Sequence, residues 1–221
     1  MSALSNSNGR SHSWGQTRSS FKVLKARSVS ALPLGLFQEV KPNRIVLSEI
    51  SKLQNIKTVC ELGCGNGCFA NQLASLGYQV TAVDLSDSGI AQAQKDYGHN
   101  VQFIRASIDR ELSTKLAAKK FDLVLAKEVI EHLYRPANLL ETALELLKPG
   151  GFLLMTTPYH GYLKNLVISL LGHTDQHYNP LWDGGHIKFF SPKTLRKLAE
   201  QANFKHIRFR FWGRIPKLLY G

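Results

Sequence analysis

The stretch KTVCELGCGNGCFANQLASLG, residues 57–77, contains a complete strand–turn–helix unit and decides the fold. Its first half is a short apolar run that ends in glycines, as expected of a buried strand followed by a tight turn. Its second half has Phe69, Leu73 and Leu76 at helical spacing and stops at Gly77, where glycine favours the end of a helix. A glycine-rich turn of this kind allows a ligand to approach the backbone closely.

The alternation of apolar runs and helical patterns continues through the following eighty residues. Strands that alternate with helices form a parallel sheet covered by helices on both faces. The sequence therefore predicts an α/β fold of the Rossmann-like, doubly wound class with a mostly parallel sheet. We expect further strands at 78–86, 101–107, 121–126, 152–157 and 204–212, and helices at 87–98, 109–119, 137–147 and 191–203.

Composition limits the class of protein and its partners. A length of 221 residues and an apolar fraction of 43% suit one globular domain with a sizeable core. The net charge of +12 is concentrated toward both ends of the chain, and no acidic residue precedes Glu39. This indicates either an anionic partner, nucleic acid or a membrane surface, or simply a solvated basic surface. No apolar run approaches the roughly 20 residues of a spanning helix.

We expect a disordered basic segment at 1–38 and a folded domain at 39–221 with a polar, aromatic insertion at 158–190. The first segment has the serine- and arginine-rich, acid-poor composition of organellar transit peptides, which plain basic tails share, so organellar import stays open. Three cysteines match no zinc pattern and indicate a reducing, cytoplasmic compartment. They are Cys60, Cys64 and Cys68.

The turn ELGCGNG, residues 61–67, indicates a nucleoside-containing cofactor. A dinucleotide fingerprint counted from Gly63 would place its last glycine at position 68, where Cys68 stands, so that match is poor. Asp84 ends the second strand, 21 positions beyond Gly63, where an acid can accept hydrogen bonds from ribose hydroxyls. The glycine turn, the acid and the strand–helix order together predict the cofactor class.

With these motifs the chain resembles the class I S-adenosylmethionine-dependent methyltransferases over about residues 40–212. ELGCGNG is similar to their E/D-x-G-x-G-x-G motif, VDLS to their acidic motif after the second strand, and LKPGG to a frequent feature before the fifth. The resemblance implies that Gly63 and Gly65 face the methionine moiety and that Asp84 holds the ribose. It also implies that the adenine is flanked by Ser107 and Ile108.

Four longer stretches resemble the ubiquinone-biosynthesis O-methyltransferases, which methylate phenolic hydroxyls on polyprenylated rings. They are KPNRIVLSEI, KEVIEHL, TTPYHGYLKNLVISLLG and GGHIKFFSPKTL. The resemblance implies a small phenolic or lipophilic acceptor and two further cofactor contacts, Arg44 and Lys127. The whole cofactor-binding set that these motifs imply is Arg44, Glu61, Gly63, Cys64, Gly65, Asp84, Leu85, Ser107, Ile108 and Lys127.

KEVIEHL contains the candidate catalytic residues Glu128, Glu131 and His132. On a helix these positions share one face, so they predict part of a site for Mg, Mn or Zn. Because a hydroxyl is a poor nucleophile until it loses its proton, either such an ion or His132 as general base would serve methyl transfer. The alternative is that the acids only stabilise a helix start. Resemblance to small-RNA 2′-O-methyltransferases adds His186 as a fourth metal ligand.

The insertion and the chain end leave several functions open. Residues 162–172 predict an amphipathic helix, which together with the basic termini favours peripheral membrane contact. RNA 2′-O-methylation and a non-catalytic cofactor-binding or membrane-interaction protein are the alternatives, and the oligomeric state stays open. Class I enzymes end in a two-stranded hairpin, whereas only GRIPKLLYG follows the last predicted strand here. We therefore expect the final strand to be short or missing.

Overall fold

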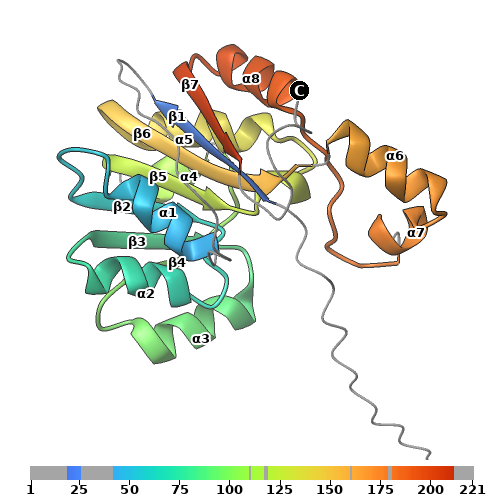
Figure 1. Cartoon of the computed structure of the whole chain (residues 1–221). Helices are drawn as coiled ribbons and strands as arrows, with labels where there is room; N and C mark the ends of the chain where they lie inside the picture. Colours follow the sequence, from blue (N-terminus) through green and yellow to red (C-terminus); the bar gives the residue numbers. More distant parts are fainter. Residues whose placement is uncertain are drawn as a thin grey trace, which may run out of the picture.

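A computed structural model describes residues 19–25, 42–109, 111–116, 119–159, 161–178 and 181–211. Its centre is a seven-stranded sheet with the order β4-β3-β2-β5-β6-β1-β7 (Figure 1). The five strands from β4 to β6 pair in parallel, which confirms the predicted class of fold. The strands are β1 (Ser19–Lys25), β2 (Thr58–Leu62), β3 (Gln79–Asp84), β4 (Gln102–Arg105), β5 (Phe121–Lys127), β6 (Leu147–Pro158) and β7 (Lys205–Phe211).

Helices cover both faces of the sheet (Figure 1). Side chains of α1, α2 and α3 pack against one face, and those of α4, α5 and α8 pack against the other. These helices are α1 (Pro42–Ile50), α2 (Cys68–Ser75), α3 (Asp87–Tyr97), α4 (Glu111–Lys115), α5 (Ala137–Leu146) and α8 (Pro192–Gln201).

Strand β5 lies at the centre of this core. Leu123 and Leu125 point into the cluster on one face, while Val124 and Ala126 point into the cluster on the other. All four are essentially inaccessible to solvent. Because both faces are covered, the strand is apolar from Leu123 to Ala126, and each large side chain there contributes roughly 1.5–3 kcal/mol by burial. The same strand carries the site motif at its carboxyl end.

Capping residues position the helices as the sequence predicts. Ser86 accepts a hydrogen bond from the Gly89 amide through its Oγ at 3.1 Å and so begins α3. Ser191 accepts from the Thr194 amide at 3.1 Å, and the Thr194 hydroxyl in turn accepts from the Ser191 amide at 2.9 Å. Such reciprocal caps satisfy amides that the first helical turn leaves unpaired.

Strand β1 corrects the expectation of a disordered segment over residues 1–38. Ser19–Lys25 pairs antiparallel with both β6 and β7 and lies between them. It therefore fills the position in the sheet that the prediction of a short or missing final strand had left incomplete. The sequence did not predict a strand at 19–25 because the two neighbouring strands supply its main-chain hydrogen bonds. Such a strand needs no long apolar run of its own. Residues 1–18 and 26–38 lie outside the described residues.

The insertion at 158–190 forms two helices and a returning segment. Helix α6 (Tyr162–Leu170) and helix α7 (Thr174–His177) lie beside the sheet rather than on either face (Figure 1). A helix is thus present over most of the predicted stretch 162–172, and residues 181–190 lead back toward α8. In the part of the chain that the structure describes, no helix is both long and apolar enough to span a membrane.

Candidate functional site

The turn between β2 and α2 uses glycine where other residues would be strained. Gly63, Gly65 and Gly67 have φ angles of 75°, 54° and 75°, in the left-handed region. A β-carbon on Gly63 would lie 2.4 Å from a methyl carbon of Val129, so this backbone packs directly against the segment after β5. The Gly63 amide also donates to the Val83 carbonyl at 2.8 Å, which ties the turn to β3.

Asp84, at the end of β3, is held rigidly beside this turn. Its carboxylate accepts hydrogen bonds from the Gly65 amide at 2.7 Å and from the Ser86 amide at 2.8 Å. Each carboxylate oxygen keeps capacity for a further hydrogen bond. Leu85 follows with 62% of its surface exposed, and Ser107 and Ile108 lie half-buried after β4. The four predicted ribose and adenine residues thus end neighbouring strands at one edge of the sheet.

A pair of oppositely charged residues lies at the ends of the next two strands along this edge, β2 and β5. Lys127 Nζ lies 3.9 Å from Glu61 Oε1 and donates a hydrogen bond to Asn43 Oδ1 at 3.1 Å. Burial raises the pKa of Glu61 to about 7, even though the Lys127 charge acts to lower it. Burial also lowers the pKa of Lys127. Arg44, the other predicted basic contact, lies exposed on α1.

KEVIEHL does not form the helix on which its ligand prediction depends. Only Ile130–His132 is helical, as a short 3-10 turn named η1. Glu128 has a φ of 51°, because its amide still donates to the carbonyl and hydroxyl of Thr156 on β6 while the chain turns away. Burial raises the pKa of the Glu128 carboxyl. The expected shared helix face is therefore absent, and Glu128 does not join its two partners.

Glu131, His132 and His186 come together nonetheless. One potential ligand atom from each lies within 4.8 Å of the other two. His186 Nε2 is 4.0 Å from Glu131 Oε1, and the two imidazole rings are 4.9 Å apart in an edge-to-face arrangement. The Ile187 and Lys188 amides donate to the Glu131 carbonyl at 2.9 and 3.0 Å, which fixes the segment that carries His186. Three of the four predicted ligands thus share one cluster.

Two backbone carbonyls determine which ring nitrogen of His132 donates a hydrogen bond. Its Nδ1 lies 2.7 Å from the Gly184 carbonyl oxygen and 3.1 Å from that of Gly185. Carbonyl oxygens only accept hydrogen bonds, so Nδ1 carries a hydrogen, and in the neutral ring Nε2 is the nitrogen that keeps a lone pair. Burial and the neighbouring His132 lower the pKa of His186, which favours its neutral form. Neutral imidazoles can accept a proton or bind a cation.

The donor set of the cluster fits a divalent cation. Two imidazole nitrogens and a carboxylate that is 1% exposed are ligands typical of Zn and Mn, while Mg prefers oxygen ligands throughout. The hydrogen bond that fixes His132 from behind is also typical of imidazoles that bind metals. The residues present therefore fit such an ion.

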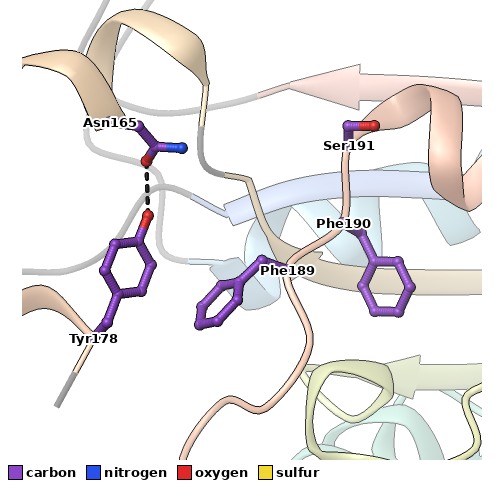
Figure 2. Close-up of a pocket in the computed structure, with 5 residues that line it drawn as sticks. All are labelled: Asn165, Tyr178, Phe189, Phe190 and Ser191. Atoms are coloured by element: carbon purple, nitrogen blue, oxygen red, sulfur yellow. Dashed lines mark hydrogen bonds between the residues drawn. The ribbon is translucent and has the colours of Figure 1, made fainter. Parts of the chain in front are cut away.

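A cavity of about 380 Å³ opens between the insertion and the start of α8 (Figure 2). Tyr178 of the insertion donates a hydrogen bond to Asn165 Oδ1 at 2.7 Å along one wall. No sequence pattern predicted a cavity at these residues; the paired aromatics that follow HIK were the available signal. The cavity is lined by Asn165, Tyr178, Phe189, Phe190 and Ser191.

These features define a class of protein, an α/β enzyme fold with a nucleoside-cofactor site at the carboxyl edge of its sheet. A family model described as a methyltransferase domain matches residues 36–208, and the chain belongs to this family. It is a methyltransferase that depends on S-adenosylmethionine, as the sequence motifs predicted.

Curated relatives and solved structures agree with this assignment. The chain is 27% identical to the ubiquinone biosynthesis O-methyltransferase of Hydrogenovibrio crunogenus over 172 residues, which cover 76% of this chain and 70% of that protein. The enzyme of the same name from Caulobacter vibrioides is 36% identical over 118 residues, or 52% and 46% of the two chains.

Two solved methyltransferases share the fold. A SAM-dependent methyltransferase from Archaeoglobus fulgidus has a TM-score of 0.61 and 19% identity, covering 80% of this chain and 73% of its own. The magnesium protoporphyrin IX methyltransferase of Synechocystis PCC 6803, solved with bound SAH, has a TM-score of 0.54 and 18% identity, with coverages of 72% and 70%.

Proposed function

We propose that this protein transfers a methyl group from S-adenosylmethionine to a hydroxyl of a small phenolic or lipophilic acceptor. The observation that carries the proposal is the position of the Glu131–His132–His186 cluster. It follows β5 directly, and Val129 at the start of the same segment packs against Gly63 of the cofactor turn. A group that activates a hydroxyl thus lies next to the turn that approaches the methyl donor. The named O-methyltransferase relatives support the same chemistry.

The cofactor residues act along the carboxyl edge of the sheet. We infer that Asp84 accepts hydrogen bonds from the ribose, while Leu85, Ser107 and Ile108 flank the adenine. The glycine turn then admits the methionine moiety, with Glu61, Cys64 and Lys127 around it. When bound, the cofactor supplies a methyl group on a sulfonium, and its carbon–sulfur bond breaks as the acceptor oxygen bonds to carbon.

The acceptor hydroxyl must lose a proton during this displacement. Nε2 of a neutral His132 can accept this proton, because Nδ1 is committed to the Gly184 and Gly185 carbonyls. We propose that a divalent ion, Zn or Mn in preference to Mg, is held by Glu131, His132 and His186. Such an ion would lower the pKa of the hydroxyl and orient it. With the ion bound, these three residues hold the acceptor site together rather than take the proton.

The insertion contributes the acceptor and membrane contacts of the proposal. Trp182 lies exposed with its ring centroid 5.7 Å from that of His186, where it can stack on an aromatic acceptor. The lipophilic part of the acceptor would reach the cavity beside Phe189. Exposed apolar residues on and after α6 suit peripheral attachment of a cytoplasmic enzyme to a membrane. They are Leu166, Val167, Leu170 and Leu171.

An acceptor assay with labelled S-adenosylmethionine tests the reaction. We expect label on an oxygen of a catechol bearing an alkyl chain, strong loss of turnover in His132→Ala, and ordinary turnover in the control variant His173→Ala. His173 is exposed and lies outside the cluster. Transfer to the 2′-hydroxyl of a short RNA, with none to catechols, would instead support the RNA alternative. Turnover in a chelator equal to that without it would remove the ion and leave His132 as the base.

A further inference from the structure

Phe189 and Phe190 are neighbours in the sequence, but they serve different surroundings. Phe190 packs against the core, and its backbone forms a bridge to Tyr159 just beyond β6. Phe189 is 49% exposed and lies on the wall of the cavity shown in Figure 2. The anchored neighbour holds the backbone of Phe189 in place, so its ring presents a fixed apolar surface to a ligand.

The shape and size of the cavity favour a flat ring. The rings of Tyr178 and Phe189 stand at 85° to each other, with their centroids 4.9 Å apart. A flat ring can stack with an offset on one of them and meet the other edge to face, the two arrangements that aromatic pairs prefer. At roughly 30 Å³ for each non-hydrogen atom, the volume of about 380 Å³ holds about a dozen of them. This is enough for one ring with a short linker and too little for a long polyprenyl tail.

Asn165 brings hydrogen-bond donors to this wall. Its Oδ1 accepts the hydroxyl of Tyr178 at 2.7 Å, so the orientation of the amide is fixed. Burial raises the pKa of Tyr178, so the hydroxyl keeps its hydrogen well above neutral pH. Among the described residues Asn165 Nδ2 has no hydrogen-bond partner, and Figure 2 shows this nitrogen turned away from Tyr178. Its two N–H groups can donate to an oxygen of a ligand, and a carbonyl oxygen only accepts.

The cavity lies within short reach of the Glu131–His132–His186 cluster. Phe189 is three residues beyond His186 in the same segment, and the Glu131 carbonyl holds the amides of the two residues between them. Three residues span at most about 10 Å between α-carbons. A molecule whose hydroxyl lies at the cluster therefore reaches the cavity through a linker of a few atoms.

We propose that the cavity selects acceptors with a second flat ring, joined to the methylated phenol by a short linker that contains a carbonyl. The ring packs between Tyr178 and Phe189, and the carbonyl oxygen accepts a hydrogen bond from Asn165 Nδ2. The acceptor class is then a two-ring phenolic ketone or ester instead of a phenol with a polyprenyl tail. The inference rests on the proposed function, because it concerns the acceptor of the same reaction.

Steady-state kinetics with three catechols tests the cavity. The first is a catechol joined through –CH2–CH2–CO– to a phenyl ring, the second has a methylene in place of the carbonyl, and the third is 4-ethylcatechol, which has no second ring. The saturated linker keeps the acidity of the catechol nearly the same in all three. We expect kcat/KM to be about 3–10-fold higher for the ketone than for the methylene compound, the effect of one hydrogen bond. The methylene compound should exceed 4-ethylcatechol by at least about fivefold through burial of its ring.

Two variants assign these preferences to residues. Asn165→Asp removes both N–H donors but keeps an oxygen that accepts from Tyr178, so it should abolish the preference for the ketone. It should leave kcat/KM for 4-ethylcatechol within about twofold. Asn100→Asp is the matched control, because it makes the same chemical change at an exposed position before β4. Phe189→Ala should remove the advantage of the second ring and leave 4-ethylcatechol unaffected.

The outcomes separate the cavity from the reaction itself. If none of the three catechols is methylated, the proposed function fails. If 4-ethylcatechol is methylated but the unaltered protein shows no preference for the ketone over the methylene compound, the role of the cavity is wrong and the reaction stands; this comparison needs no variant to fold. Retention of the ketone preference in Asn165→Asp, or an equal loss for all three compounds, would also contradict the hydrogen bond from Asn165.

Discussion

At the scale of single residues, His132 links the insertion to the reacting centre. Its ring uses one nitrogen to hold the Gly184 and Gly185 carbonyls and leaves the other for chemistry. Glu131 uses its main-chain carbonyl to hold Ile187 and Lys188, so two residues of η1, Glu131 and His132, fix the same returning segment. His186 is therefore delivered by the backbone of the segment rather than by its own side chain. A change in that segment should alter the site even though its residues lie far away in the sequence.

Metal affinity of the cofactor-free protein tests the cluster residue by residue. We expect one equivalent of Zn to bind in calorimetry, with an affinity lowered at least about 100-fold in His186→Ala because a ligand is lost. His173→Ala is the matched control and should not differ from the unaltered protein. Glu128→Gln should change the affinity by less than about threefold, since Glu128 lies outside the cluster. A loss in Glu128→Gln as large as in His186→Ala would support the four-ligand set that the sequence suggested.

Asp122 provides a pH-dependent part of the stability at the opposite edge of the sheet. Burial acts to raise its pKa, but hydrogen bonds from Lys148, Thr58 and the Lys57 amide outweigh it and lower the pKa to about 2. A carboxyl whose pKa is lower in the folded state contributes stability above its unfolded pKa, near 4, and loses it as the pH falls toward 2. We expect Asp122→Asn to cost about 1–2 kcal/mol at pH 6 in urea unfolding.

The difference between the Asp122→Asn protein and the unaltered one should shrink steadily between pH 4 and pH 2. Asp175→Asn, on the exposed helix α7, is the control and should follow the unaltered protein at every pH. A difference that stays constant across this range would show that Asp122 acts through packing or neutral hydrogen bonds instead of through its charge.

At the scale of elements, helix α6 has an apolar surface that the domain does not cover. Leu170 and Leu171 are 76% and 63% exposed, and Val167 is 52% exposed. Replacing these three with serine should reduce recovery with anionic liposomes in flotation by at least about fivefold, because each buried apolar side chain contributes to membrane affinity. Leu76→Ser, at the end of α2 on the main body, removes an equally exposed leucine and should have no effect. Unchanged flotation of the triple variant would exclude α6 as the contact.

The elements that sequence patterns predict well are those with local causes. Ser86 and Ser191 cap their helices through hydrogen bonds within three residues, so the start of each helix could be read directly. KEVIEHL failed as a helix because a contact distant in sequence, from the Glu128 amide to Thr156 on β6, turns the backbone into a left-handed conformation. No local pattern reports that contact. The proximity of His186 came from family resemblance, because no local pattern reports a contact between His132 and a segment that lies 52 positions further along the chain at Gly184.

At the scale of the whole molecule, the sheet is completed by the beginning of the chain. The antiparallel strand between β6 and β7 is β1, whose register runs from Ser19 opposite Pro158 to Lys25 opposite Phe152. Without it, β6 and β7 would each present unpaired main-chain groups toward the other. The cofactor turn follows β2 and the first part of the cluster follows β5, and both strands lie on the side of β6 that faces away from β1. The rest of the cluster comes from the insertion after the carboxyl end of β6. Closure of the sheet and formation of the cofactor site are therefore separable properties.

Deletion of residues 1–25 tests this separation. Loss of a seven-residue strand paired on both sides should lower the melting temperature by at least about 10 °C, for a stability loss of roughly 4 kcal/mol. Exposed strand edges should also cause concentration-dependent aggregation, visible by light scattering. The matched control is deletion of residues 1–18, which keeps β1 and should melt like the full chain. Equal melting temperatures for the two deletions would show that β1 does not contribute to stability.

A peptide of residues 19–25 extends the same argument from loss to recovery. Because β1 pairs through its main chain with both neighbours, the peptide added to the shortened protein should insert between β6 and β7 and raise its melting temperature with concentration. A peptide of the same composition in scrambled order is the control. Cofactor affinity of the shortened protein at low concentration should stay within about threefold of the full chain, because the cofactor residues lie on α1 and at the ends of β2, β3, β4 and β5. A parallel loss of cofactor affinity would mean that closure of the sheet and formation of the site are coupled.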